Sequence, residues 1–109
     1  MPTNIFVGEF EQLVLLSLLR LGDEGYALKL RAELSTIANR NISRGALYRT
    51  LDRLEEKGMV EWELEETDIP ERGGKPRRRF AVSKTGIAAL RESRDTLLRL
   101  WSGLAEVLG

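Results

Sequence analysis

Residues 43–64, SRGALYRTLDRLEEKGMVEWEL, decide the fold of this chain. Ser43 is one of the side chains that commonly cap the first turn of a helix. Apolar residues follow it at intervals of four and three, which is the spacing of one helix face, until a glycine follows Lys57. The stretch therefore predicts a helix from Ser43 to about Lys57. The residues that we expect to face the core are Leu47, Leu51 and Leu54.

The spacing of the apolar residues then changes to that of a strand. Val60, Trp62 and Leu64 alternate with glutamates, the period of two that is typical of a half-buried strand. A second alternating run extends from Arg77 to Val82, and the segment between the two runs is rich in glycine and proline. These features predict a β-hairpin with a long turn. In its second strand, the residues expected to point inward are Phe80 and Val82.

Two further helices are predicted before this region. Glu9 to Leu21 is apolar on nearly every side, which is typical of a helix that is buried on more than one face. In so short a chain, this favours a partner chain that covers part of the helix. Gly22 ends it, and Asp23 is a candidate cap for a second helix. The apolar stripe of that second helix consists of Tyr26, Leu30, Leu34 and Ile37.

After Ser83, a last helix is expected to extend to near the C-terminus. Its heptad a and d positions hold Ile87, Leu90, Leu97, Trp101, Leu104 and Leu108. Three heptads are too few for a long coiled coil, and a helix packed on its own domain is the alternative. We favour a twofold dimer, because further leucines make the face wider than a small domain covers. The predicted dimer contacts are Phe10, Leu13, Leu90, Leu97, Trp101, Leu104 and Leu108.

In order, these elements predict a mostly α fold with a small β-hairpin, namely a winged helix-turn-helix domain followed by a dimerisation helix. We place the winged domain at residues 1–82 and the C-terminal dimerisation helix at residues 83–109. The chain has 109 residues, which is the size of one domain. Hydrophobic residues make up 42% and charged residues 31%, as in globular proteins.

Composition excludes much of enzyme chemistry. The sequence has no cysteine and no histidine, so thiolate nucleophiles, imidazole bases, disulfides and the usual zinc ligands are absent. It also has no glycine-rich phosphate loop after a strand. We therefore expect no catalytic activity, no cofactor and no metal. The one strongly apolar run is half the length of a membrane span, and no secretion signal is evident, so we expect a cytoplasmic protein.

The net charge of zero conceals charge blocks along the chain. Residues 40–53 carry +3, residues 54–71 carry −7, and residues 72–79 carry +5. Two positive blocks on either side of a negative one can attract a polyanion, because the local field acts over about 10 Å in ordinary salt. The predicted partner is double-stranded DNA. The DNA-contacting residues that we expect are Ser43, Arg44, Gly45, Tyr48, Arg49 and Arg53 in the helix, and Arg72, Lys75 and Arg77 in the loop.

Several roles stay open at this level. Arg44 and Arg49 have the planar fork that pairs with guanine, and either can equally contact phosphate. Gly45 weakens a helix, which fits a close approach of DNA to the backbone and fits equally a clash avoided inside the protein. The basic loop can bind phosphate at its tip, while Arg77 and Arg79 can pair with strand glutamates across the hairpin.

Three segments, FEQLVLLSLLRLGDEGYALKLRAEL, GALYRTLDRLEEKGMVE and PERGGKPRRRFAVSKTG, closely resemble the PadR family of bacterial transcriptional regulators. The resemblance covers nearly the whole chain. It implies a repressor on a roughly palindromic operator, with the recognition helix at Ser43–Arg53 and the wing at Arg72–Arg77. It also implies one C-terminal helix, Ser83–Leu108, that dimerises against the N-terminal helix of the partner.

Some members of the family release DNA when a small aromatic or drug-like compound occupies a cavity between the subunits. By that resemblance, Trp101 and Leu97 are the candidate effector contacts, although Trp101 can also be plain interface core. The alternative function is a winged-helix protein–protein interaction module without DNA binding. Such a module would show an apolar or mixed-charge third helix, whereas this one carries arginines.

Overall fold

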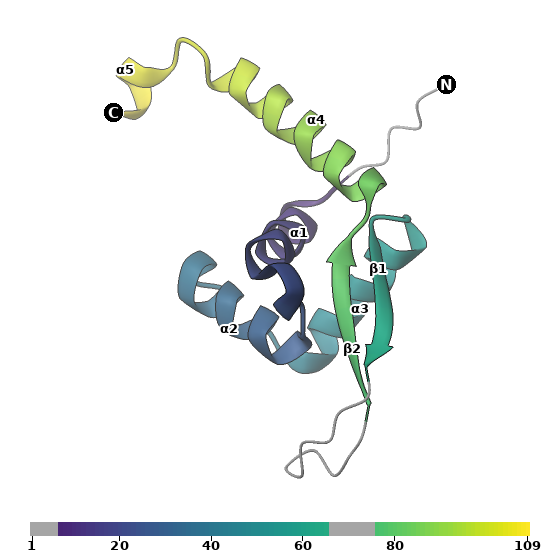
Figure 1. Cartoon of the computed structure of the whole chain (residues 1–109). Coiled ribbons are helices and arrows are strands. Elements are labelled where there is room, and N and C mark those ends of the chain that lie inside the picture. Colours follow the sequence, from purple (N-terminus) through teal and green to yellow (C-terminus); the bar gives the residue numbers. More distant parts are fainter. Residues whose placement is uncertain (1–6, 66–75) are drawn as a thin grey trace.

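A computed structural model describes residues 7–65 and 76–109 of the chain. The helices and the two strands follow one another in the order predicted for a winged helix-turn-helix. The mostly α fold with one hairpin is therefore confirmed (Figure 1). The elements are α1 (Glu9–Leu21), the 3-10 turn η1 (Gly22–Glu24), α2 (Ala27–Ala38), α3 (Arg44–Glu56), β1 (Val60–Glu65), β2 (Arg77–Val82), α4 (Lys84–Trp101) and α5 (Ala105–Leu108).

Helix α3 matches its prediction closely. The Ser43 hydroxyl accepts a hydrogen bond from the Ala46 amide at 3.1 Å, so the predicted cap is present. Its three core leucines are fully buried between the other helices and the hairpin. Since burial of a leucine stabilises a fold by about 1.5–3 kcal/mol, this face fixes how the helix is oriented on the core. These buried residues are Leu47, Leu51 and Leu54.

The start of α2 differs from its prediction. Asp23 does not cap the helix but lies in η1, and Tyr26 is the N-cap residue. The reason is a tertiary contact: the Gly25 carbonyl accepts a hydrogen bond from the Phe80 amide at 2.8 Å, so the chain runs beside β2 before α2 begins. A Cβ on Gly25 would lie 2.1 Å from the Phe80 carbonyl oxygen, and only glycine permits this approach. In the last turn of α2, Ile37 is exposed, so the predicted apolar stripe does not pack on the core over its whole length.

The two strands form an antiparallel hairpin in which Trp62 is opposite Phe80 and Leu64 is opposite Arg78. Phe80 is buried, and Val82 packs against the core, as expected. The prediction of a half-buried β1 fails toward the turn, because Trp62 is 38% and Leu64 is 60% exposed. The hairpin projects beyond the helices there, so these side chains have little of the core beneath them (Figure 1).

The C-terminal segment packs on the domain only at its start. Leu90 belongs to the core of its own chain, which leaves it almost no surface for a partner, contrary to the predicted dimer contact. Every residue from 96 to 109 is exposed. The single helix predicted over Ser83–Leu108 is wrong, because α4 ends at Trp101 and the chain turns through Gly103, whose φ of +82° favours glycine. The short helix α5 follows this turn.

Within residues 7–65 and 76–109, no helix is both long and apolar enough to cross a membrane.

Candidate nucleic-acid interface

The first two turns of α3 present free hydrogen-bond donors. Arg44, Gly45 and Arg49 are exposed, and in the described ranges the two arginine side chains make no hydrogen bond or ion pair. The backbone N–H groups that begin a helix lack intrahelical acceptors, and the helix dipole adds positive potential at the same end. The start of α3 is therefore suited to bind an anion.

Gly45 is not required by packing inside the protein. A Cβ at this position would meet only the Arg49 guanidinium, at 3.6 Å, which is an ordinary van der Waals contact. The backbone of Gly45 is also helical, with no positive φ. Packing among the described residues therefore does not require a glycine here, and the backbone at the start of α3 stays open for a close approach.

Tyr48 connects α3 to the hairpin. Its ring meets the Phe80 ring edge-on, with centroids 6.4 Å apart, and its exposure is intermediate. The Arg44 guanidinium lies 5.9 Å from the centroid of the same ring. The face predicted to contact DNA thus includes one residue that also packs inward, and this packing fixes the hairpin relative to α3.

At the other end of α3, Arg53 belongs to an internal cluster. Its Nε lies 3.7 Å from a carboxylate oxygen of Glu11, and one Nη donates to the Thr50 hydroxyl at 3.4 Å. The Lys57 ammonium donates to both oxygens of Glu11, at 2.7 and 3.0 Å. The Glu11 side chain is only 8% exposed, so α1 and α3 are joined by a largely buried ion pair.

Burial would raise the pKa of the Glu11 carboxyl, but the hydrogen bonds from Lys57 and from the Gly8 amide outweigh it and lower the pKa below its ordinary value. One signal in the sequence could have indicated this residue, namely a carboxylate within the most apolar helix. The interpretation of Arg53 as a DNA contact now competes with its role in this cluster.

Ion pairs between the two strands hold the outer face of the hairpin, which carries Glu63, Glu65, Arg77 and Arg79. Such pairs are one of the roles predicted above for the basic segment. Arg79 pairs with Glu63 and, at 3.5 Å, with Glu65. Arg77 lies 3.5 Å from Glu65, and its guanidinium stacks 3.6 Å from the centroid of the Tyr26 ring. The Nε of Arg77 is buried and forms no hydrogen bond. Among the buried side-chain nitrogen and oxygen atoms of the described ranges, no other lacks a hydrogen bond. Arg77, predicted to contact DNA, is therefore engaged within the protein.

Tyr26 and Glu65 complete this contact. The Tyr26 hydroxyl donates a hydrogen bond of 2.6 Å to Glu65, which raises the pKa of the tyrosine and lowers the pKa of the carboxyl. This arrangement anchors β1 and β2 to the start of α2.

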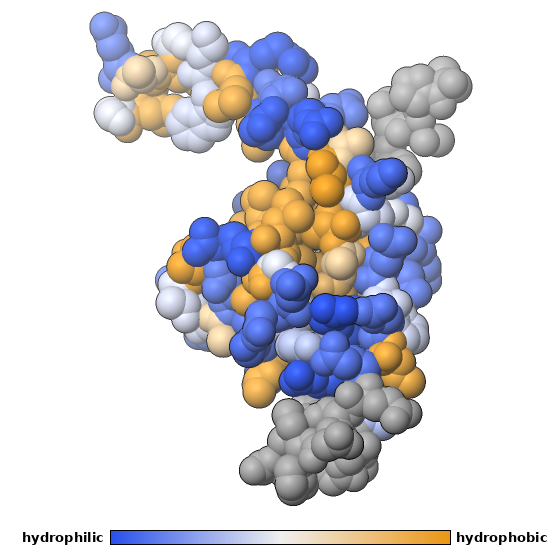
Figure 2. Space-filling model, in the orientation of Figure 1, coloured by the Kyte–Doolittle hydropathy of each residue, from blue (hydrophilic) through white to orange (hydrophobic). Residues whose placement is uncertain are grey.

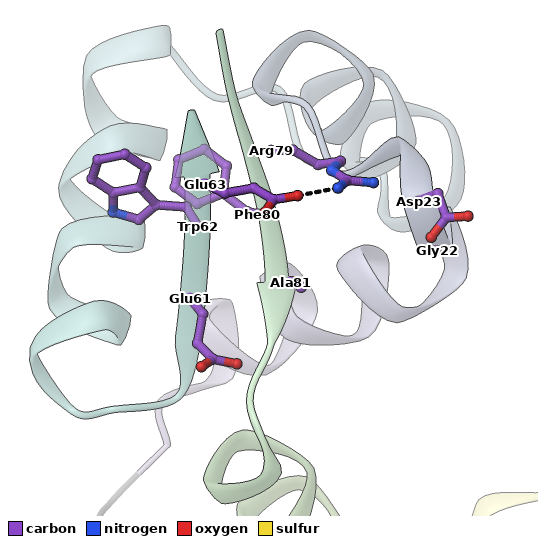
Figure 3. Close-up of a pocket in the computed structure, with 8 residues that line it drawn as sticks. All are labelled: Gly22, Asp23, Glu61, Trp62, Glu63, Arg79, Phe80 and Ala81. Carbon is purple, nitrogen blue, oxygen red and sulfur yellow. Dashed lines mark hydrogen bonds and ion pairs between the residues drawn. The ribbon is translucent and has the colours of Figure 1, made fainter. Parts of the chain in front are cut away.

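A groove of about 440 Å³ lies between η1 and the outer face of the hairpin. Figure 3 shows Arg79 pointing into it toward Asp23, while Trp62 points to the opposite side of the hairpin. Carboxylates outnumber cations along this groove, with Asp23, Glu61 and Glu63 against Arg79. Phosphate would be repelled from this side. The groove and the first turn of α3 are thus electrostatically opposite surfaces.

Arg72 and Lys75, the remaining predicted DNA contacts, lie outside the described residues.

A three-helix core, an exposed cationic helix start and a hairpin packed beside that helix define a winged helix-turn-helix protein. Residues 15–92 match the model of the transcriptional regulator PadR-like family, and the chain belongs to this family. It is therefore a transcription regulator and not an enzyme, as its composition and its resemblance predicted.

Solved structures agree with this assignment. A PadR family transcriptional regulator from Eggerthella lenta DSM 2243 is 28% identical, with a TM-score of 0.66 over 89% of this chain and 81% of the other. A PadR-like regulator from Bacillus cereus strain ATCC 14579 is 20% identical, with a TM-score of 0.67 over 88% of this chain and 90% of the other, and shows the shared fold. Among curated proteins, none matches this chain significantly.

Proposed function

We propose that this regulator binds a roughly palindromic operator as a homodimer, through α3 and the hairpin, and represses transcription there. The observation that carries the proposal is the exposed, unpaired donor set formed by Arg44, Gly45 and Arg49 at the start of α3. Charged groups usually find partners when carboxylates are near, and the ion pairs among the described residues, such as those of Glu11 and Glu63, use other cations. A polyanion is the ligand that such a surface fits.

In this arrangement, the first turn of α3 enters the major groove. The open backbone of Gly45 lets a phosphate or a base edge approach closely, while the Ser43 hydroxyl holds the helix start in place. Arg44 and Arg49 supply forked donors that either pair with guanine or bind phosphate. We assign Arg72 and Lys75, which lie between the two strands in the sequence, to phosphate or minor-groove contacts, which add affinity that falls with salt.

The second copy of the chain is proposed to cover the apolar surface of the C-terminal segment. Figure 2 shows apolar residues gathered over α1 and at the base of α4. Residues 96–109 contact nothing in their own chain closely enough to be buried, yet include many large apolar side chains. The exposed residues proposed for the interface are Leu16 and Leu19 of α1, and Leu97, Leu98, Leu100, Trp101, Leu104, Val107 and Leu108. Phe10 and Leu13, half-buried on α1, complete it.

An effector site at this interface is a further part of the proposal. Trp101 is 57% exposed in the single chain, so a flat aromatic compound could stack on it between two subunits. Leu97, one helical turn earlier, lies on the same face. Titration with planar aromatics should then shift the fluorescence of Trp101 and release DNA. Unchanged emission from a folded dimer would argue against the site.

The function is tested by selecting bound sequences from a random duplex pool, followed by gel shifts with variants. We expect a roughly symmetric consensus with two half-sites. Arg44→Ala or Arg49→Ala should weaken operator binding by ~1–3 kcal/mol where the residue reads a base, while Lys75→Ala should weaken all duplexes alike. Arg91→Ala, at an exposed position of α4, is the matched control and should bind as wild type. Equal losses on operator and random DNA for Arg44→Ala, Arg49→Ala and Lys75→Ala would refute these roles.

A further inference from the structure

The hairpin carries a third cation that neither the charge blocks nor the family resemblance singled out. Along β2, Arg78 alternates with Arg77 and therefore lies on the opposite face, the face that holds Phe80. Because Phe80 packs against Tyr48, this face of the hairpin is turned toward α3. Among the described cations of the hairpin, Arg78 is therefore the one on the face that is turned toward α3.

Aromatic rings surround the Arg78 guanidinium. It lies 4.9 Å from the Trp62 ring, 5.1 Å from the Tyr48 ring and 5.4 Å from the Phe80 ring, measured to their centroids. Cation–π contacts of this kind orient a guanidinium but leave its N–H groups without acceptors. Unlike Arg77, whose Nε is buried, Arg78 makes no hydrogen bond or ion pair with any described residue and keeps its donors accessible.

Tyr48 brings two unpaired cations together. Arg44, from α3, and Arg78, from β2, both lie within 6 Å of the centroid of its ring. Glu55, at the end of α3, accepts a hydrogen bond of 2.9 Å from the Trp62 indole and forms no ion pair with either arginine among the described residues. Two guanidiniums that share one ring and form no ion pair with a described carboxylate add their positive potentials and attract an anion. The arrangement therefore fits an external anion that contacts both elements at once.

We propose that Arg78, held over the rings of Tyr48, Trp62 and Phe80, contacts a DNA phosphate beside the recognition helix, and that Arg77 does not. The inference rests on the proposed DNA binding and adds a residue and a division of labour to it. Arg78 continues the cationic surface from the start of α3 onto the hairpin, whereas Arg77 anchors the hairpin to Tyr26 and Glu65 on the far face.

The test compares two neighbouring variants with the same charge change. Arg78→Gln should weaken binding to operator and to random duplex alike, by about tenfold, and should lower the slope of log affinity against log salt by about one. Arg77→Gln should leave that slope near the wild-type value and should lower the unfolding temperature instead. Wild-type affinity and salt slope in a folded Arg78→Gln protein would overturn the assignment.

A footprint on the unmodified protein covers the case in which the Arg78→Gln variant does not fold. Phenylglyoxal modifies accessible arginines, and mass spectrometry locates the product. Bound duplex should protect Arg78, while Arg77 should react slowly with or without DNA, because its guanidinium is stacked on Tyr26. Unprotected Arg78 in a protein that binds DNA overturns this inference alone. A wild-type protein that binds no duplex overturns the proposed function as well.

Discussion

Gly45→Ala separates a role in DNA contact from a role in packing. Alanine is a better helix former than glycine by up to about 1 kcal/mol. The added Cβ meets only the flexible Arg49 side chain at 3.6 Å, so no clash offsets this gain. The variant should therefore be more stable than the wild type by up to about 1 kcal/mol, which corresponds to a rise of about 4 °C in unfolding temperature.

The same methyl group should obstruct DNA, because it occupies the space that the bare backbone leaves at the helix start. We expect operator affinity to fall by about tenfold, equivalent to about 1.4 kcal/mol, while stability rises. Circular dichroism melting and fluorescence anisotropy with a labelled duplex measure the two effects. Thr36→Ala, at an exposed position of α2, is a control that should stabilise without loss of affinity. A stabilised Gly45→Ala protein with wild-type affinity would refute the reasoning.

Three further predictions concern the framework. Glu11→Gln should destabilise the fold at neutral pH. Because the pKa of the Glu11 carboxyl is lowered in the folded state, the stability advantage of the wild type should be present above the ordinary value of 4.5 and disappear as pH falls through the lower folded value. A stability difference that does not depend on pH would contradict the ion pair with Lys57. Trp101→Asp should convert the dimer to a monomer in sedimentation, and an unchanged mass would place the interface elsewhere. Tyr26→Phe should lower stability by about 0.5–1.5 kcal/mol in chemical denaturation through loss of its hydrogen bond to Glu65, and no loss would show that bond to be unimportant.

Local chemistry made some elements predictable from sequence. A capping serine, a leucine face and a terminating glycine act within α3 itself, so its bounds and core residues could be predicted from the chain alone. The start of α2 could not, because it depends on the Gly25 backbone meeting that of Phe80, which is distant in sequence. The break after Trp101 was likewise hidden by an apolar heptad pattern that continues through it.

The candidate site shows the same division. Charge blocks indicated the cationic start of α3, because adjacent residues of a helix turn stay together in space. They could not distinguish Arg77 from Arg78, which differ by one position in a strand and therefore lie on opposite faces. Which face meets α3 is decided by the packing of Phe80 on Tyr48, a tertiary contact.

The central claim is that DNA binds at the first turn of α3, and the backbone amide of Gly45 reports on it most directly. Nuclear magnetic resonance of the nitrogen-15-labelled protein, titrated with the selected duplex, follows this amide, which has no intrahelical acceptor. We predict that the largest shift changes fall on Gly45 and its neighbours in that turn, with little change along the acidic groove at Asp23. An unmoved Gly45 signal in a titration that shifts the groove residues would contradict the account.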